Sequence, residues 1–167
     1  IIPAGVFANL PALSDVTVEF GAIPAHMFEG SGVTVLTLGA GVTEIGDSAF
    51  ANTALTSAEM QNVTAIGAGA FANTALTSAE IQNVTAIGAG AFEGSALERV
   101  QLNAAASVGE RAFANTKLTK MVIPTAGSFP LSAVEGTSAE LRLPADATDE
   151  QLAAWNETLQ RPWYDPM

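Results

Sequence analysis

The apolar residues of this chain recur with a period of about 21 residues. Residues 51–71 and 72–92 share the sequence ANTALTSAE-x-QNVTAIGAGAF and differ only at Met60 and Ile81. Aligning the aromatic position extends the period through Phe7, Phe28, Phe50, Phe71, Phe92 and Phe113, with Val134 one period later. Five residues before each of these stands a second apolar residue: Ile2, Ile23, Ile45, Ile66, Ile87, Val108 and Phe129. A fixed period of this length is typical of a solenoid, and these positions predict seven turns.

Each period also carries the pattern of one short strand. Residues 76–81 end in an alternation of apolar and polar positions, which predicts a half-buried strand, and the pattern recurs at 33–38, 55–60, 97–102 and 118–123. Two residues after each aromatic position only Asn or Gly occurs: Asn9, Gly30, Asn52, Asn73, Gly94, Asn115 and Gly136. Because these residues tolerate positive φ best, we expect each short helical turn around the Phe to end in a left-handed residue.

One such turn cannot bury its own apolar face. Stacking equivalent turns in register converts each apolar position into a continuous file, with parallel strands about 4.8 Å apart. The sequence therefore predicts an α/β solenoid of short parallel strands over residues 1–144, about 30 Å long from that strand spacing.

The two ends of the chain differ. Ile2 already occupies an apolar file and no polar cap precedes it, so we expect further repeats or another domain N-terminal to this segment. Residues 145–167 predict a helical cap of the same domain. Thr148 and Gln151 fit a capping box for a helix over about residues 149–160, and Pro144 and Pro162 are expected to end the last strand and this helix.

Aromatic and apolar side chains are expected to line one face of this cap. They are Leu152, Trp155 and Leu159 on the helix, with Trp163 and Tyr164 folding back over the final strand. The two tryptophans have two interpretations. They cover the open end of the core, as terminal caps of repeat arrays do, or they form an exposed aromatic site for sugar, and the first is favoured.

The repeat pattern resembles a known family. L-x-x-I-x-L, a polar turn and V-x-x-I-G-x-x-A-F-x-[GN], seen at residues 97–108 and 66–73, is similar to the leucine-rich repeats of the BspA-like (Treponema-type) family. The resemblance covers about residues 1–144, although Thr or Ser replaces a frequent Cys and Val6 and Met27 replace the Ala before Phe. It implies a right-handed β-α superhelix in secreted or cell-surface bacterial proteins, with adhesion or host-interaction roles. No catalytic or ligand residues carry over.

Composition and charge argue against several classes of function. The absence of Cys removes disulfides, thiolate metal sites and a cysteine nucleophile. The net charge is −11, and residues 1–98 contain nine acidic residues and no Lys or Arg. Nucleic acids and anionic membranes are therefore disfavoured as partners. No apolar run reaches the roughly 20 residues that span a bilayer, so direct membrane insertion of this segment is not expected.

The sequence shows no recognisable active site. His26 is the only histidine and, without Cys, cannot form an ordinary zinc site; we interpret it as a solvent-facing turn residue. Gly67 with Gly69, and Gly88 with Gly90, lack the Gly-Lys-Ser/Thr of a phosphate loop and recur with the period, which indicates structural turns. We expect no enzyme activity, no metal and no cofactor.

The outward strand positions form a candidate interaction face. In register, Glu59 and Glu80 should stack, where two like charges either hold a weak cation or are tolerated through screening by water, the second being favoured. The neighbouring file turns basic toward the C-terminus. The residues predicted to form this face are Ser57, Glu59, Ser78, Glu80, Arg99, Gln101 and Lys120.

Two functions fit these features. The first is a noncatalytic module of a bacterial surface protein that meets an extracellular protein or glycan. The second is a structural spacer that holds another domain away from the cell surface. Near-identical turns suit a spacer, and the mostly small or polar outward residues suit either a spacer or a low-affinity adhesin that acts by avidity.

Overall fold

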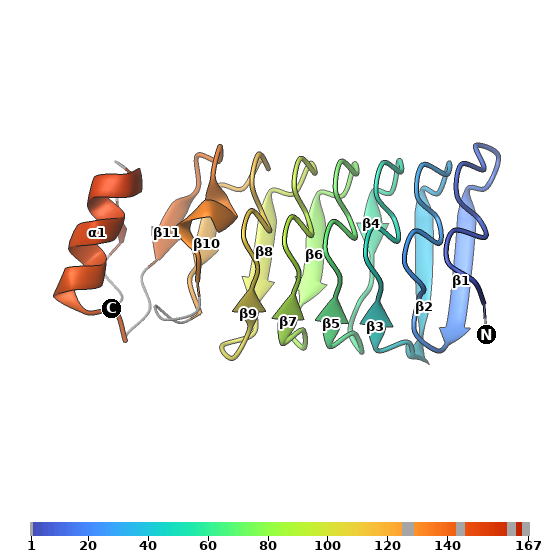
Figure 1. Ribbon diagram of the computed structural model, residues 1–167, viewed down its shortest axis with the longest axis horizontal. Coiled ribbons are helices and arrows are strands. Elements are labelled where there is room, and N and C mark those ends of the chain that lie inside the picture. Colours follow the sequence, from blue (N-terminus) through green and yellow to red (C-terminus); the bar gives the residue numbers. More distant parts are fainter. Residues whose placement is uncertain (1, 125–128, 143–145, 160–162, 165–167) are drawn as a thin grey trace.

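The turns follow one another along a rod, from strand β1 at one end to helix α1 at the other (Figure 1). The computed structural model describes residues 2–124, 129–142, 146–159 and 163–164, with residues 156–159 and 163–164 described for the backbone alone.

One side of the rod is a parallel sheet built from strands of successive turns. Register pairs equivalent residues of neighbouring turns, for example Ala79 with Val100 and Met121 with Leu141. An isolated parallel bridge between Glu59 and Glu80 joins its two sections. Its strands are β1 (Asp15–Phe20), β2 (Val35–Gly41), β4 (Ser57–Ala58), β6 (Ser78–Ile81), β8 (Arg99–Leu102), β10 (Lys120–Val122) and β11 (Glu140–Arg142). Burial in β6 alternates as the sequence predicts, with Ala79 and Ile81 inside.

A second parallel sheet, which the sequence analysis did not predict as strands, lies on another side of the turns. Its two-residue strands are β3 (Glu44–Ile45), β5 (Ala65–Ile66), β7 (Ala86–Ile87) and β9 (Ser107–Val108), paired in that order. Ile45, Ile66, Ile87 and Val108 are buried in one file, and a bridge from Ile23 extends it. The predicted isoleucine file is therefore also a backbone ladder.

The phenylalanines stack directly upon one another, as predicted. Ring centroids of successive turns are 5.1–5.6 Å apart and the ring planes lie within 12° of parallel. Phe50, Phe71, Phe92 and Phe113 are fully buried, whereas Phe7, in the first turn, is 37% exposed. This column of rings is the centre of the hydrophobic core.

The predicted left-handed residues are all present. Asn9, Gly30, Asn52, Asn73, Gly94, Asn115 and Gly136 have φ between 54° and 69°. A second left-handed file, which was not predicted, lies two residues before the Phe and contains Gly5, His26, Ser48, Gly69, Gly90 and Arg111. Each turn around a Phe is therefore bounded by two left-handed residues.

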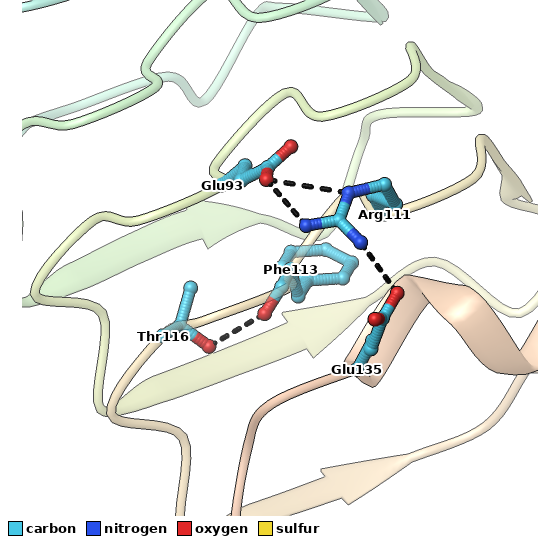
Figure 2. Close-up of polar contacts among 5 residues, drawn as sticks. All are labelled: Glu93, Arg111, Phe113, Thr116 and Glu135. Carbon is cyan, nitrogen blue, oxygen red and sulfur yellow. Dashed lines mark hydrogen bonds and ion pairs between the residues drawn. The ribbon is translucent and has the colours of Figure 1, made fainter.

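A hydroxyl closes most of these turns. Three residues after the aromatic position, the Thr or Ser side chain donates a hydrogen bond of 2.6–3.0 Å to the carbonyl of that position, as Thr116 does to Phe113 (Figure 2). These hydroxyls occupy the position where the resembling repeats often have Cys. Ser95 occupies the equivalent position but makes no such bond within the described residues. The buried polar file therefore satisfies backbone carbonyls inside the core.

The C-terminal end is closed by a helix. Helix α1 (Asp149–Leu159) packs against the 3₁₀ helix η1 (Leu131–Val134). The predicted capping box is present, because the Thr148 backbone N–H donates to Gln151 Oε1 (3.0 Å) and the Gln151 N–H donates to Thr148 Oγ1 (3.3 Å).

Trp155 is buried in the core cluster, which favours the interpretation of this tryptophan as a cover for the core. Strand β12 (Trp163–Tyr164) pairs in parallel with β11, so this segment does fold back over the final strand. Pro144 and Pro162 lie outside the described residues.

The structure supports a parallel β-solenoid of about six turns, each with one ring in the Phe column. The α/β description is not confirmed, because residues 2–124 and 129–142 contain strands, turns and η1 but no α-helix. Where the seventh turn is predicted, Val134 replaces Phe and η1 replaces the usual turn. Seven turns and right-handed winding stay predictions. No helix within the described residues is long and apolar enough to cross a bilayer.

Replacing Phe71 by Ala is expected to lower the free energy of unfolding by about 3–5 kcal/mol, because a fully buried ring is lost from the middle of the stack. Urea titration measures the loss. Phe20→Ala is the control, since the Phe20 side chain is 81% exposed and its removal should change stability by about 0.5 kcal/mol or less. A loss below about 1 kcal/mol at Phe71 would contradict the stacked core.

Gly88→Ala should also destabilise the fold, by at least about 1–3 kcal/mol, through a clash between turns. A Cβ at Gly88 would lie 2.5 Å from the Ala68 nitrogen and 2.6 Å from the Gly67 carbonyl carbon, and backbone atoms cannot move aside. Thermal denaturation of Gly88→Ala and of Ala89→Ser, a change at the exposed next residue, compares the two positions. Equal melting temperatures would show that the turns are not packed this closely.

Candidate functional site

All seven residues of the predicted interaction face are exposed on the outer side of the first sheet, called here the strand face. The register forms two files. In the first file, Val35 pairs with Ser57. Further along the same file the successive partners are Ser78, Arg99, Lys120 and Glu140. The second pairs Glu59 with Glu80 and Glu80 with Gln101. The structure thus brings together the residues that the sequence placed on one face.

The middle of the strand face is acidic. Glu59 and Glu80 are direct neighbours across strands, and neither forms an ion pair with a described residue. The described residues contain no group of three or more His, Cys, Asp or Glu side chains that could hold a metal ion. Two exposed carboxylates alone are a weak set of ligands, so the arrangement favours screening by water.

Toward the C-terminus the strand face opens into a groove of about 510 Å³, called here the cationic groove. It forms at a change in strand pairing. Strands β6 and β8 pair at four successive residues, whereas β8 and β10 pair at one position, Arg99 with Lys120. The residues that line the groove are Arg99, Val100, Gln101, Thr119, Lys120, Met121, Val122, Glu140 and Arg142.

Three cationic side chains surround this groove. Arg99 and Arg142 form no ion pair with any described residue, and Lys120 Nζ lies 3.7 Å from Glu140 Oε2 with 80% of the lysine side chain exposed. An exposed ion pair at this distance is weak. The groove therefore presents a net positive charge on a protein of net charge −11.

The sequence pattern predicted Arg99, Gln101 and Lys120 on this part of the face but not Arg142. Arg142 is level with Val122 in the neighbouring strand, and Val122 follows Gln101 by one period. The second outward file, continued one turn beyond Val122, would have predicted Arg142 on the same face. The groove itself had no such signal, because it depends on where two strands separate.

A second charged cluster, also missed, ties three turns together away from the groove (Figure 2). Arg111 donates from Nε and Nη2 to Glu93 Oε1 (3.3 and 2.7 Å) and from Nη1 to Glu135 Oε2 (2.5 Å). The hydrogen bond with Glu93 and the charges of Glu135 and Glu93 raise the pKa of the Arg111 guanidinium. Because arginine is charged at physiological pH in any case, this cluster acts as a clamp between turns and is no pH switch.

His26 lies in an exposed turn, as predicted. Its Nδ1 is 2.7 Å from Glu29 Oε2 and 52% of the side chain is exposed. His26 has a φ of 58°, in the second left-handed file. The contact with Glu29 explains the position of the imidazole, and no catalytic role is needed to explain it.

Replacing Glu80 by Gln is expected to raise the melting temperature by about 1–3 °C at low ionic strength, because a like-charge neighbour of Glu59 is removed. Glu98→Gln is the matched control. Glu98 is also exposed, but its neighbours in the adjacent turns are Thr77 and Thr119, and neither carries a negative charge. Millimolar calcium should leave the melting temperature of the wild type unchanged. Stabilisation by calcium that Glu80→Gln abolishes would instead establish a cation site.

Comparison with known proteins agrees with this geometry. The sequence model described as the BspA type leucine-rich repeat region matches residues 21–133 with six copies. No curated protein matches the chain. Solenoids of this family are typical noncatalytic binding scaffolds and generally occur in bacterial surface proteins. The chain belongs to the BspA-type leucine-rich repeat family.

Proposed function

We propose that this chain is a noncatalytic, extracellular binding module of a bacterial surface protein, which attaches to a protein or glycan through its strand face. The observation that carries the proposal is the cationic groove, where Arg99 and Arg142 are exposed and form no ion pair with a described residue. Arginines placed in this way on a rigid sheet are available to a partner.

The scaffold suits such a role. Equivalent backbone positions are fixed by hydrogen bonds between turns, for example from Phe50 N–H to the Ala70 carbonyl and from Phe71 N–H to the Ala91 carbonyl (2.8 and 2.7 Å). Side chains on the strand face therefore start from positions that need little ordering on binding. We further infer right-handed winding and a seventh, shortened turn around Val134, which would place the groove near the capped end of the superhelix.

A spacer is the second candidate, and a specific observation favours it. Turns 51–71 and 72–92 are nearly identical, and their outward positions on the strand face are Ser57, Glu59, Ser78 and Glu80. These turns add length without adding an apolar contact surface. The two functions are compatible, because the spacer character lies in the middle turns and the groove lies in the later ones.

The absence of native cysteine allows a direct test. Ser78→Cys and Ala86→Cys each place one thiol on the exterior, on the strand face and on the second sheet respectively. A bulky maleimide polymer attached to either thiol blocks one surface. The protein, displayed as multimers on beads, is screened against immobilised extracellular proteins and glycans.

The expected result is multivalent binding that the polymer on Ser78→Cys weakens at least about tenfold and the polymer on Ala86→Cys leaves unchanged. Equal weakening by both polymers would move the binding surface away from the strand face. If the multimers bind nothing on the panel, the spacer function is the correct one.

A further inference from the structure

We propose that the cationic groove binds a short acidic peptide segment of a partner protein, in which carboxylate side chains flank an apolar residue. This inference rests on the proposed function, since it names the partner for one part of the strand face. It uses the charge of the groove, the arrangement of its lining residues and the acidic turns beside it.

The groove concentrates positive charge that the rest of the chain lacks. It holds three of the six Lys and Arg residues of the whole sequence, while residues 1–98 hold none. The guanidinium groups of Arg99 and Arg142 match a carboxylate in shape and can each donate two parallel hydrogen bonds to it. Carboxylate is therefore the ligand group that this donor set favours.

The arrangement of the lining residues fits an extended peptide. Arg142 lies two strands beyond Arg99 and two residues further along the strand direction, so their Cα atoms are roughly 10 Å apart across the sheet and about 7 Å apart along it. Alternate side chains of an extended peptide point to the same side at intervals of about 7 Å. Acidic residues two to four positions apart can therefore reach both arginines.

One apolar side chain is exposed among these cations. Val122 lines the groove and is 57% exposed, whereas Met121 is buried in the core and Val100 packs partly buried against it. An exposed valine beside guanidinium groups suits an apolar residue placed two positions from each of two acids, because alternate side chains of an extended peptide face the same side. None of the lining residues whose side chains the structure describes is aromatic.

The acidic turns restrict the length of the ligand. Glu80 lies on the strand next to β8, and Glu59 lies one strand further. At a strand spacing of about 4.8 Å both carboxylates are within roughly one Debye length of the groove. A long, uniformly charged polysaccharide would extend over these carboxylates and be repelled. A short segment with its charge confined to the groove is repelled less, because it does not pass directly over Glu59 and Glu80.

Fluorescence anisotropy with a labelled E-S-V-S-E peptide, whose two Glu and one Val share one side when extended, tests the proposal on the full chain. Binding is expected at 50 mM NaCl and should weaken at least about tenfold in the double variant Arg99→Gln/Arg142→Gln, because both carboxylate contacts are lost. Lys117→Gln is the matched control, since Lys117 is exposed, carries the same charge and does not line the groove. Its affinity should stay within about twofold of the wild type.

A charge exchange provides the second measurement. The variant Arg99→Glu/Arg142→Glu should lose E-S-V-S-E and bind K-S-V-S-K more tightly than the wild type does. Circular dichroism of each variant verifies the fold. Equal affinity of the wild type for Q-S-V-S-Q and E-S-V-S-E would overturn the proposal, as would full binding by the double Gln variant.

Two further outcomes separate this inference from the proposed function. A polyuronate chain that binds the groove more tightly than the peptide would assign the site to acidic glycans and overturn the peptide proposal alone. Bead binding that the polymer on Ser78→Cys blocks, but that the double Gln variant retains, would also refute the groove while leaving the binding function in place. Failure of both peptide and bead binding would reject the two proposals together.

Discussion

The stacking of each turn directly on the next is the interaction on which the whole structure depends. Parallel strands repeat at about 4.8 Å and the phenyl rings at 5.1–5.6 Å, so backbone pairing and ring packing are satisfied by nearly the same rise. Gly88 has no room for a Cβ because of this close approach, and the hydroxyl of Thr116 bonds to the Phe113 carbonyl within one turn. Each turn is complete only when its neighbours are present, as in other solenoids.

The periodic features could be read from the sequence, because each equivalent position needs the same residue type. The Phe and Ile files, the left-handed Asn and Gly residues and the register of the strand face all belong to this class. The capping box at Thr148 and Gln151 was also predictable, since it depends on two residues three positions apart.

Other features could not be predicted for identifiable reasons. The second left-handed file contains His26, Ser48 and Arg111 as well as glycines, so no residue preference reveals it. The strands of the second sheet have two residues each, too short for an alternation to appear. The clamp at Arg111 joins acids 18 and 24 residues away, neither one a whole period. The cationic groove arises from a local loss of strand pairing, which composition does not encode.

The periodic residues specify the fold, and the residues that depart from the period specify the surface available for function. The periodic residues are occupied in building the rod, and the residues that depart from the period are the ones free to specify a partner. Arg99 follows Ser57 and Ser78 in the first outward file, and it changes the chemistry of the strand face while β8 still pairs with β6 in register. Specificity in such a scaffold can change one outward residue at a time.

The uneven distribution of charge along the rod has a consequence for encounters at a distance. Nine acids without a single base occupy the first 98 residues, and every Lys and Arg follows them. A rigid rod with this distribution has an electric dipole moment along its axis. In the field near a negatively charged surface such a molecule is turned with its C-terminal end foremost.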